Sequence, residues 1–114
     1  MTKLNKKFGS IDELCCREFE TDETLALLVA TNPQIYASWG VENKLNYLNK
    51  ALFMKVNGHH HKGWLVITLA FSDTYSFYLL EGRATYIYAQ HEIYFDQLQE
   101  QIDIAIERID DYKF

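Results

Sequence analysis

The feature that most constrains the fold is the run from Ala51 to Leu80, which reads ALFMKVNGHHHKGWLVITLAFSDTYSFYLL. Within it, the segment from Trp64 to Phe71 is almost entirely apolar and rich in β-branched and aromatic residues. This short apolar run predicts a β-strand that is covered on both faces and is therefore central in its sheet. One face of that strand carries Leu65, Ile67, Leu69 and Phe71, and the other carries Trp64, Val66, Thr68 and Ala70.

Three further strands are predicted beside the central one. In the first, Leu52, Met54 and Val56 alternate with Phe53 and Lys55, which is the pattern of a half-buried strand, and Asn57-Gly58 supplies a hairpin turn after it. Because Lys62-Gly63 gives a second break, the sequence is compatible with a tight turn at Asn57-Gly58 or with a loop that spans residues 57–63. Two more strands cover residues 75–80 and 83–89. The short connections between them predict an antiparallel meander.

Helices are predicted before this sheet. The segment Ser10-Ile11-Asp12-Glu13 fits a capping box for a short helix that runs toward Glu20. Thr21 or Asp22 caps a second helix, which Asn32-Pro33 ends because the residue before a proline avoids the α region.

Residues 34–50 are interpreted as a loop with one short helical turn. The positions of Leu45 and Leu48 fit two alternatives, a helical pair or part of an early strand.

A long helix is predicted from about Glu92 to Asp111. Apolar side chains recur on one face of it, at Phe95, Leu98, Ile102, Ala105, Ile106 and Ile109. Acidic side chains recur on another face, at Asp96, Glu100, Asp103, Glu107 and Asp110. Ile104 falls away from the apolar stripe and is expected to be exposed. The predicted fold is therefore α+β, a four-stranded antiparallel β-meander packed against a long C-terminal helix, with short N-terminal helices.

Length and composition predict one domain. The chain has 114 residues, of which 48% are hydrophobic, and these values are typical of a globular protein. Residues 1–9 are expected to form a flexible arm and residues 10–114 a single α+β domain. The net charge of −5 disfavours broad non-specific binding to nucleic acid or to an anionic membrane, although a local basic site remains compatible with it.

The sequence also predicts a cytoplasmic protein. Its two cysteines, Cys15 and Cys16, are adjacent, which disfavours a bridge between them and indicates a reducing compartment. No apolar run is long enough for a transmembrane helix, and the basic N-terminus lacks the apolar core of a secretory signal.

Five segments of the chain, ASWGVENKL, LFMKVNG, KGWLVITL, DTYSFYL and IYFDQLQEQID, carry a resemblance. In this order they resemble a group of small uncharacterised proteins encoded by bacterial phages and integrated mobile elements. The resemblance covers about residues 37–103 and consists of turn residues and strands, so no catalytic residue is transferred. It implies an accessory protein of a mobile element that is expressed inside a bacterium.

Histidines and tyrosines are weak candidates for chemistry. His59 and His61 share one face of an extended backbone and, with His91, provide candidate metal ligands. His91-Glu92 near several tyrosines suggests acid–base chemistry, but no positioned nucleophile or phosphate-binding loop accompanies them. The histidine-rich loop is therefore interpreted as a solvated turn, and no enzyme activity and no cofactor are expected.

The function predicted from the sequence is binding of another macromolecule by a non-enzymatic protein. The acidic face of the C-terminal helix is expected to contact an unidentified protein, for example a host factor that handles nucleic acid. The partner-binding candidates are Asp96, Glu100, Asp103, Ile104 and Glu107. The alternative is a nucleic-acid-binding module on a tyrosine-bearing sheet face. Its candidate residues are Lys55, Lys62, Arg83, Tyr86 and Tyr88.

Overall fold

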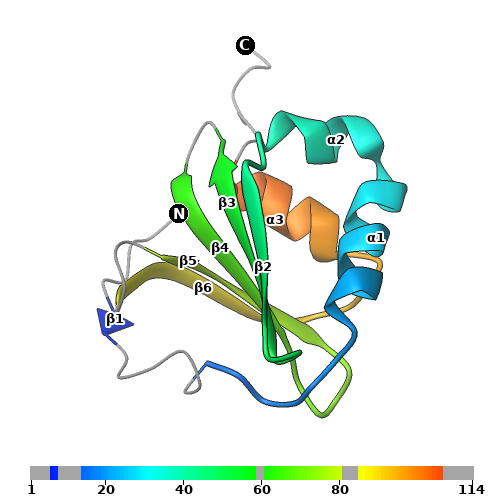
Figure 1. Ribbon diagram of the computed structural model, residues 1–114, viewed down its shortest axis with the longest axis vertical. Helices are drawn as coiled ribbons and strands as arrows, with labels where there is room; N and C mark the ends of the chain where they lie inside the picture. Colours follow the sequence, from blue (N-terminus) through cyan, green and yellow to red (C-terminus); the bar gives the residue numbers. More distant parts are fainter. Residues whose placement is uncertain (1–5, 8–13, 59–60, 81–84, 107–114) are drawn as a thin grey trace.

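The protein is an α+β structure in which one antiparallel sheet carries three helices. The computed structural model describes residues 6–7, 14–58, 61–80 and 85–106 (Figure 1). The six-stranded sheet has the order β1-β6-β5-β4-β3-β2, and all of its neighbouring strands are antiparallel. Along the chain the elements are β1 (Lys6–Lys7), α1 (Thr21–Thr31), α2 (Pro33–Ser38), β2 (Asn43–Tyr47), β3 (Ala51–Asn57), β4 (Lys62–Leu69), β5 (Tyr75–Leu80), β6 (Thr85–Ile93) and α3 (Leu98–Ile106).

The predicted meander is present and forms the middle of a larger sheet. The four predicted strands correspond to β3, β4, β5 and β6, each paired with the next in the chain. β2 adds one edge strand, and the two-residue β1, which lies within the predicted N-terminal arm, adds the other. The sheet is wider than the predicted four-stranded meander because residues 43–47 pair with β3. Of the alternatives left open for Leu45, the early strand is therefore the one that the structure shows.

β4 is central, as its two-sided apolar pattern predicts. Leu65 and Ile67 are fully buried on one face of the sheet, and Val66 is fully buried on the other. Phe71 was predicted to belong to this strand, but that prediction is wrong. β4 ends at Leu69, and Phe71 lies in the following turn with 80% of its surface exposed. Backbone bonds from Ala70 N–H to Thr74 O and from Asp73 N–H to Ala70 O close that turn.

The β3–β4 hairpin turns after Asn57. Asn57 pairs with Lys62, so Asn57 belongs to the strand instead of the turn. The amide of Gly58 donates to the carbonyl of His61 at 2.9 Å, and residues 59–60 lie outside the described structure.

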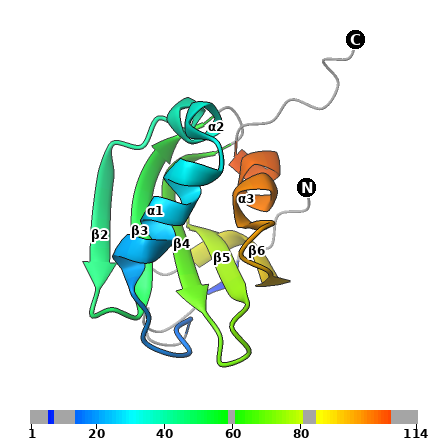
Figure 2. The same ribbon diagram turned by 90° about the vertical axis from the view of Figure 1, so that its right-hand side faces the viewer.

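The three helices pack against the same face of the sheet (Figure 2). The larger core lies between them and the strands, and we call this the helix face of the sheet. The opposite face, which we call the second face, carries a smaller apolar cluster. The core of the helix face includes Leu28 from α1, Leu52, Met54 and Val56 from β3, Leu65 and Ile67 from β4, Phe77 and Leu79 from β5, and Leu98, Ile102 and Ile106 from α3. The second-face cluster comprises Leu14, Ala51, Val66, Tyr78 and Leu80.

The segment before α1 links these two faces. Leu14 packs in the cluster on the second face, whereas Phe19 packs in the core of the helix face. The chain therefore passes around the end of the sheet between these two residues (Figure 1). The helix predicted toward Glu20 is wrong over residues 14–20, which are irregular because their two apolar anchors lie on opposite sides of the sheet. The predicted capping box at Ser10 to Glu13 lies outside the described residues.

α1 and α2 are separated at Asn32-Pro33, where the sequence predicts a helix end. α1 starts at Thr21, and Glu20 is its N-cap residue, so the helix begins one residue before the position expected for a cap at Thr21. The side chain of Asn32 caps α2, since its Oδ1 accepts hydrogen bonds from the amides of Gln34 and Ile35 at 3.0 and 3.3 Å. α2 is the short helical turn expected within residues 34–50.

α3 is shorter than the helix predicted from Glu92. β6 continues through His91 and Glu92 to Ile93, which pairs with Tyr75, so the chain is still a strand where a helix was expected. Residues 94–97 form a turn, and Phe95, predicted to be buried, is 63% exposed. The predicted burial of Leu98, Ile102, Ala105 and Ile106 is confirmed. Residues 107–114, including Ile109 and Asp110, lie outside the described structure.

Candidate functional site

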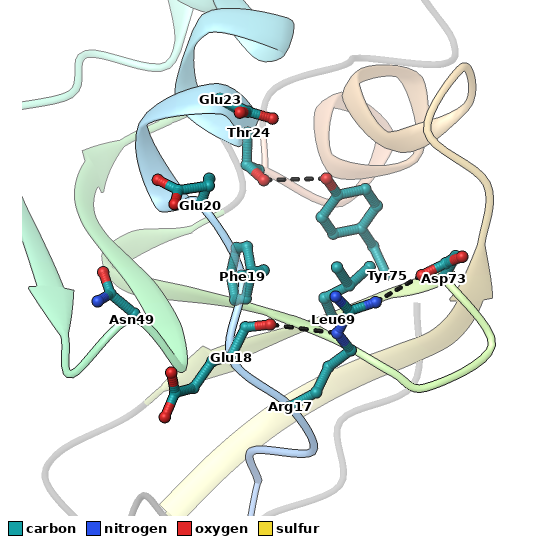
Figure 3. Close-up of a pocket in the computed structure, with 10 residues that line it drawn as sticks. All are labelled: Arg17, Glu18, Phe19, Glu20, Glu23, Thr24, Asn49, Leu69, Asp73 and Tyr75. Carbon is teal, nitrogen blue, oxygen red and sulfur yellow. Dashed lines mark hydrogen bonds and ion pairs between the residues drawn. The ribbon is translucent and has the colours of Figure 1, made fainter.

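The described residues form a pocket at the start of α1. It has a volume of about 440 Å³ and lies between α1, the hairpin turn after β2 and the turn after β4 (Figure 3). Its lining residues are Arg17, Glu18, Phe19, Glu20, Glu23, Thr24, Asn49, Leu69, Asp73 and Tyr75.

Two aromatic side chains support this pocket. Phe19 is buried and meets the half-buried Tyr75 edge to face, with ring centroids 6.3 Å apart and an interplanar angle of 81°. The hydroxyls of Tyr75 and Thr24 are 2.9 Å apart and hydrogen bonded, which fixes the first turn of α1 over the start of β5. The amide of Phe19 donates to the carbonyl of Asn49 at 2.7 Å. The pocket is therefore held by contacts from three separate parts of the chain.

Asn49 occupies its place because of a tight turn between β2 and β3. Leu48 and Asn49 both have positive φ, at 51° and 56°, and the amide of Lys50 donates to the carbonyl of Tyr47 at 2.8 Å. Two central residues with positive φ match the right-handed twist of a hairpin. Asn46 reinforces the turn, because its Oδ1 accepts from the Asn49 amide and its Nδ2 donates to Asn49 Oδ1, both at 2.8 Å.

The charge of the pocket is strongly acidic. Glu18, Glu20, Glu23 and Asp73 contribute four carboxylates, and Arg17 is the one cation among the lining residues. Arg17 already pairs with Asp73, with Nη1 and Oδ1 2.6 Å apart, while its Nε donates to the carbonyl of Glu18 at 3.1 Å. The pocket thus has a formal charge of −3, and its pairing of an aromatic floor with exposed carboxylates suits a cationic side chain.

The acidic face predicted on the C-terminal helix is only partly present. Asp96 lies in the turn before α3, Glu100 is exposed on the helix, and Ile104 is 38% exposed as predicted. Asp103 was predicted to face a partner, but it is buried with 7% of its surface exposed. Its Oδ1 accepts a hydrogen bond from the indole N–H of the fully buried Trp39 at 3.0 Å. Glu107 lies outside the described residues.

A second buried polar residue, Gln99, shows that this side of α3 faces the interior of the protein. Gln99 is buried, and its Nε2 donates to the carbonyls of Leu28 and Asn32 at 2.7 and 2.9 Å. These carbonyls belong to the end of α1, whose last turn would otherwise leave acceptors unsatisfied. α3 is therefore buried on two sides, by the sheet and by the α1–α2 unit, and its acidic residues do not form one continuous exposed stripe.

The predicted metal ligands are not brought together. His61 is buried, and its Nε2 lies 3.2 Å from the carbonyl of Trp64. His91 is exposed on β6, with Nδ1 2.9 Å from Ser76 Oγ and its ring 5.6 Å from that of Tyr78. His59 lies outside the described residues. Within the described ranges, no group of three or more His, Cys, Asp or Glu side chains is placed to hold a metal ion.

The candidates for nucleic-acid binding are divided between the two faces. Lys55 and Lys62 are exposed on the second face. Tyr88 instead packs on Phe77 beneath the helices, with ring centroids 5.9 Å apart, and donates to Gln90 Oε1 at 3.1 Å. Tyr86 lies on β6 opposite Leu80, and Arg83 lies outside the described residues. Tyr88 is therefore unavailable for base stacking.

The pocket was not predicted from the sequence. The signal that the sequence contained was the alternation Glu18-Phe19-Glu20, in which one apolar side chain is buried between two exposed acids. Arg17 and Asp73 lie 56 positions apart, and nothing in the sequence shows that they meet. Cys15 is half-buried and Cys16 is exposed.

Comparison of the chain with family models, with curated proteins and with solved structures finds no match. None of the described helices is long and apolar enough to cross a membrane.

Proposed function

We propose that the protein acts without enzymatic chemistry, by binding a basic segment of another protein in the acidic pocket at the start of α1. The observation that supports this proposal is the arrangement of Glu18, Glu20 and Glu23 around the aromatic floor made by Phe19 and Tyr75. The resemblance to proteins of phages and mobile elements suggests a host factor as the source of that segment.

The chemistry of a lysine or arginine side chain matches both parts of the pocket. The aliphatic stem of such a side chain packs on apolar surface while its charged head stays near water and carboxylates. A cation close to an aromatic ring is further attracted by the electrons of the ring face. Because Arg17 is engaged by Asp73, the three glutamates are the carboxylates that an incoming cation neutralises.

This proposal keeps the acidic partner-binding surface expected from the sequence but places it on a different element. Asp103 is committed to Trp39, which leaves Glu100 and Ile104 as the exposed candidates on the described part of α3. The pocket instead has its carboxylates along the lining of one site, where neighbouring residues of a basic segment can approach them.

The test is a titration with a fluorescently labelled hexa-arginine peptide, followed by anisotropy at low salt. We expect the double variant Glu20→Lys/Glu23→Lys to weaken binding by about 2- to 30-fold, because each exposed charge pair contributes about 0.2–1 kcal/mol. The matched control is Glu42→Lys/Glu100→Lys, which makes the same change in net charge away from the pocket. Circular dichroism is used to check that both variants keep the fold.

The two double variants separate the possible outcomes. Equal weakening in both shows that only overall charge attracts the peptide and contradicts a pocket site. If only the control variant weakens binding, and Ile104→Asp weakens it too, the partner surface lies on α3, as predicted from the sequence. Weakening confined to Glu20→Lys/Glu23→Lys supports the pocket.

A further inference from the structure

The second face of the sheet carries a row of aromatic side chains on three neighbouring strands. Tyr47 on β2 lies beside Phe53 on β3, with ring centroids 6.3 Å apart and planes tilted by 57°. Phe53 in turn lies beside Trp64 on β4, with centroids 6.1 Å apart and planes at 71°. All three side chains are half-buried, so part of each remains accessible to solvent.

Strand register places lysines next to this row. Lys55 lies directly opposite Trp64, and Lys62 is two residues before Trp64 on β4, so both share the face of the aromatic row. Both lysines are exposed. Leu45 on β2, opposite Phe53, is 52% exposed and extends the apolar surface to the edge of the sheet.

The charge of this part of the chain has the opposite sign to that of the whole protein. Residues 43–72 contain four lysines, Lys44, Lys50, Lys55 and Lys62, and no aspartate or glutamate, although the net charge of the protein is −5. Acidic residues therefore lie outside β2, β3 and β4. A partner that stacks on rings and carries negative charge fits this surface, whereas a basic peptide does not.

We propose that the second face binds single-stranded nucleic acid, with unpaired bases on Phe53 and Trp64 and phosphates at Lys55 and Lys62. Aromatic side chains beside basic residues are the usual means of binding single strands without sequence preference. The site is separate from the acidic pocket, whose floor residues Phe19 and Tyr75 pack on the helix face.

The spacing of the rings favours a flexible single strand over a duplex. Stacked bases in one strand of a duplex are about 3.4 Å apart along the axis, whereas neighbouring rings here are separated by more than 6 Å. Bases must therefore leave their own stack to reach successive rings. Oligothymidylate, which stacks weakly on itself, is expected to bind better than oligoadenylate or duplex DNA.

The first test uses labelled oligo-dT of about eight nucleotides and a pair of charge reversals. Lys55→Glu is expected to weaken binding by about 1.4- to 5-fold, because one exposed charge pair contributes about 0.2–1 kcal/mol. It should also reduce the salt dependence of binding, because phosphate contacts release counterions. Lys44→Glu is the matched control. Lys44 is also exposed on the β2–β3 hairpin, but it pairs with the buried Met54 and so lies toward the other face. Equal weakening by the two variants overturns the proposal.

The second test separates stacking from charge. Phe53→Leu keeps an apolar side chain in the cluster but removes the ring, so we expect binding to weaken about 5-fold or more with no change in salt dependence. Oligo-dT should also quench tryptophan fluorescence, since Trp64 is half-buried whereas the other tryptophan, Trp39, is fully buried.

Three results contradict the proposal. They are absence of oligo-dT binding by the wild-type protein at low salt, unchanged binding by Phe53→Leu, and tighter binding of duplex DNA than of oligo-dT. A second copy of the chain on the same face is the other possible occupant, and it would form a dimer in sedimentation experiments. A dimer that Leu45→Lys disrupts and that oligo-dT leaves intact also counts against a nucleic-acid site.

Discussion

The two faces of the sheet differ in how completely they are covered. On the helix face, α1, α2 and α3 bury a continuous core that includes Phe77, Leu98 and Ile102. Polar contacts lock this layer as well, from Trp39 to Asp103 and from Gln99 to the end of α1. On the second face, Tyr47, Phe53 and Trp64 stay half-buried. Stability is thus concentrated on one side of the sheet, which leaves the other side free to present side chains to a partner.

The largest expected effect tests this division of stability. Ile102→Ala, at a fully buried site on the helix face, should lower the free energy of unfolding by about 2–5 kcal/mol because it leaves a cavity. Phe53→Leu on the second face should lower it by less than about 1.5 kcal/mol, because the site is half-exposed and stays apolar. Urea unfolding followed by circular dichroism measures both. Similar losses in the two variants would show that both faces contribute equally.

A smaller effect is expected at the polar contact beneath the helices. Trp39→Phe removes one hydrogen-bond donor to the buried Asp103 and should reduce the free energy of unfolding by about 1–3 kcal/mol, since a hydrogen bond to a buried carboxylate is lost. The same exchange on the second face, Trp64→Phe, should change it by about 0.5 kcal/mol, the range of ordinary surface substitutions. The comparison uses the same urea titration. If Trp64→Phe is as destabilising as Trp39→Phe, the indole hydrogen bond is not the cause.

The smallest effect concerns pH at the margin of the helix layer. Burial raises the pKa of the Tyr36 hydroxyl above its usual value of 10.0, where the ring lies 5.7 Å from that of Trp39. The neutral hydroxyl is therefore favoured in the folded state. This contribution to stability is complete below pH 10 and is lost as the pH rises through the folded pKa. The urea midpoint of the wild type should fall more between pH 9 and about pH 11 than that of Tyr36→Phe, and equal falls would assign the change to other groups.

The sheet was predictable because its signals are local. The almost entirely apolar run from Trp64 to Phe71 and the alternation around Phe53 determine which strands are central and which are half-covered. Short turns then determine which strands are neighbours. The strand β2 was only one of the alternatives left open for Leu45, because all but one of its five residues are exposed and no alternation of buried and exposed positions marks it.

The helices were less predictable because their boundaries depend on distant contacts. The periodicity from Phe95 to Ile106 fits a helix throughout, yet the helix starts only at Leu98. The residues before it are a turn and, up to Ile93, a strand that pairs with β5. Asp103 has the spacing of an exposed acid, but it is a buried acceptor because it contacts Trp39, which lies 64 positions away in the chain. The acidic pocket was not predicted for the same reason, because its walls come from three separate parts of the chain.

The bond from Gln99 to the Leu28 carbonyl joins residues 71 positions apart. During synthesis, α1 therefore leaves the ribosome long before the residue that satisfies its last turn. The strands from β2 to β6 can pair as they emerge, since each of β3 to β6 pairs with the strand before it. The helix layer cannot close until α3 has been made. A nascent chain halted before residue 98 would expose the apolar side of its sheet, which makes this interval the one in which the protein most needs a chaperone.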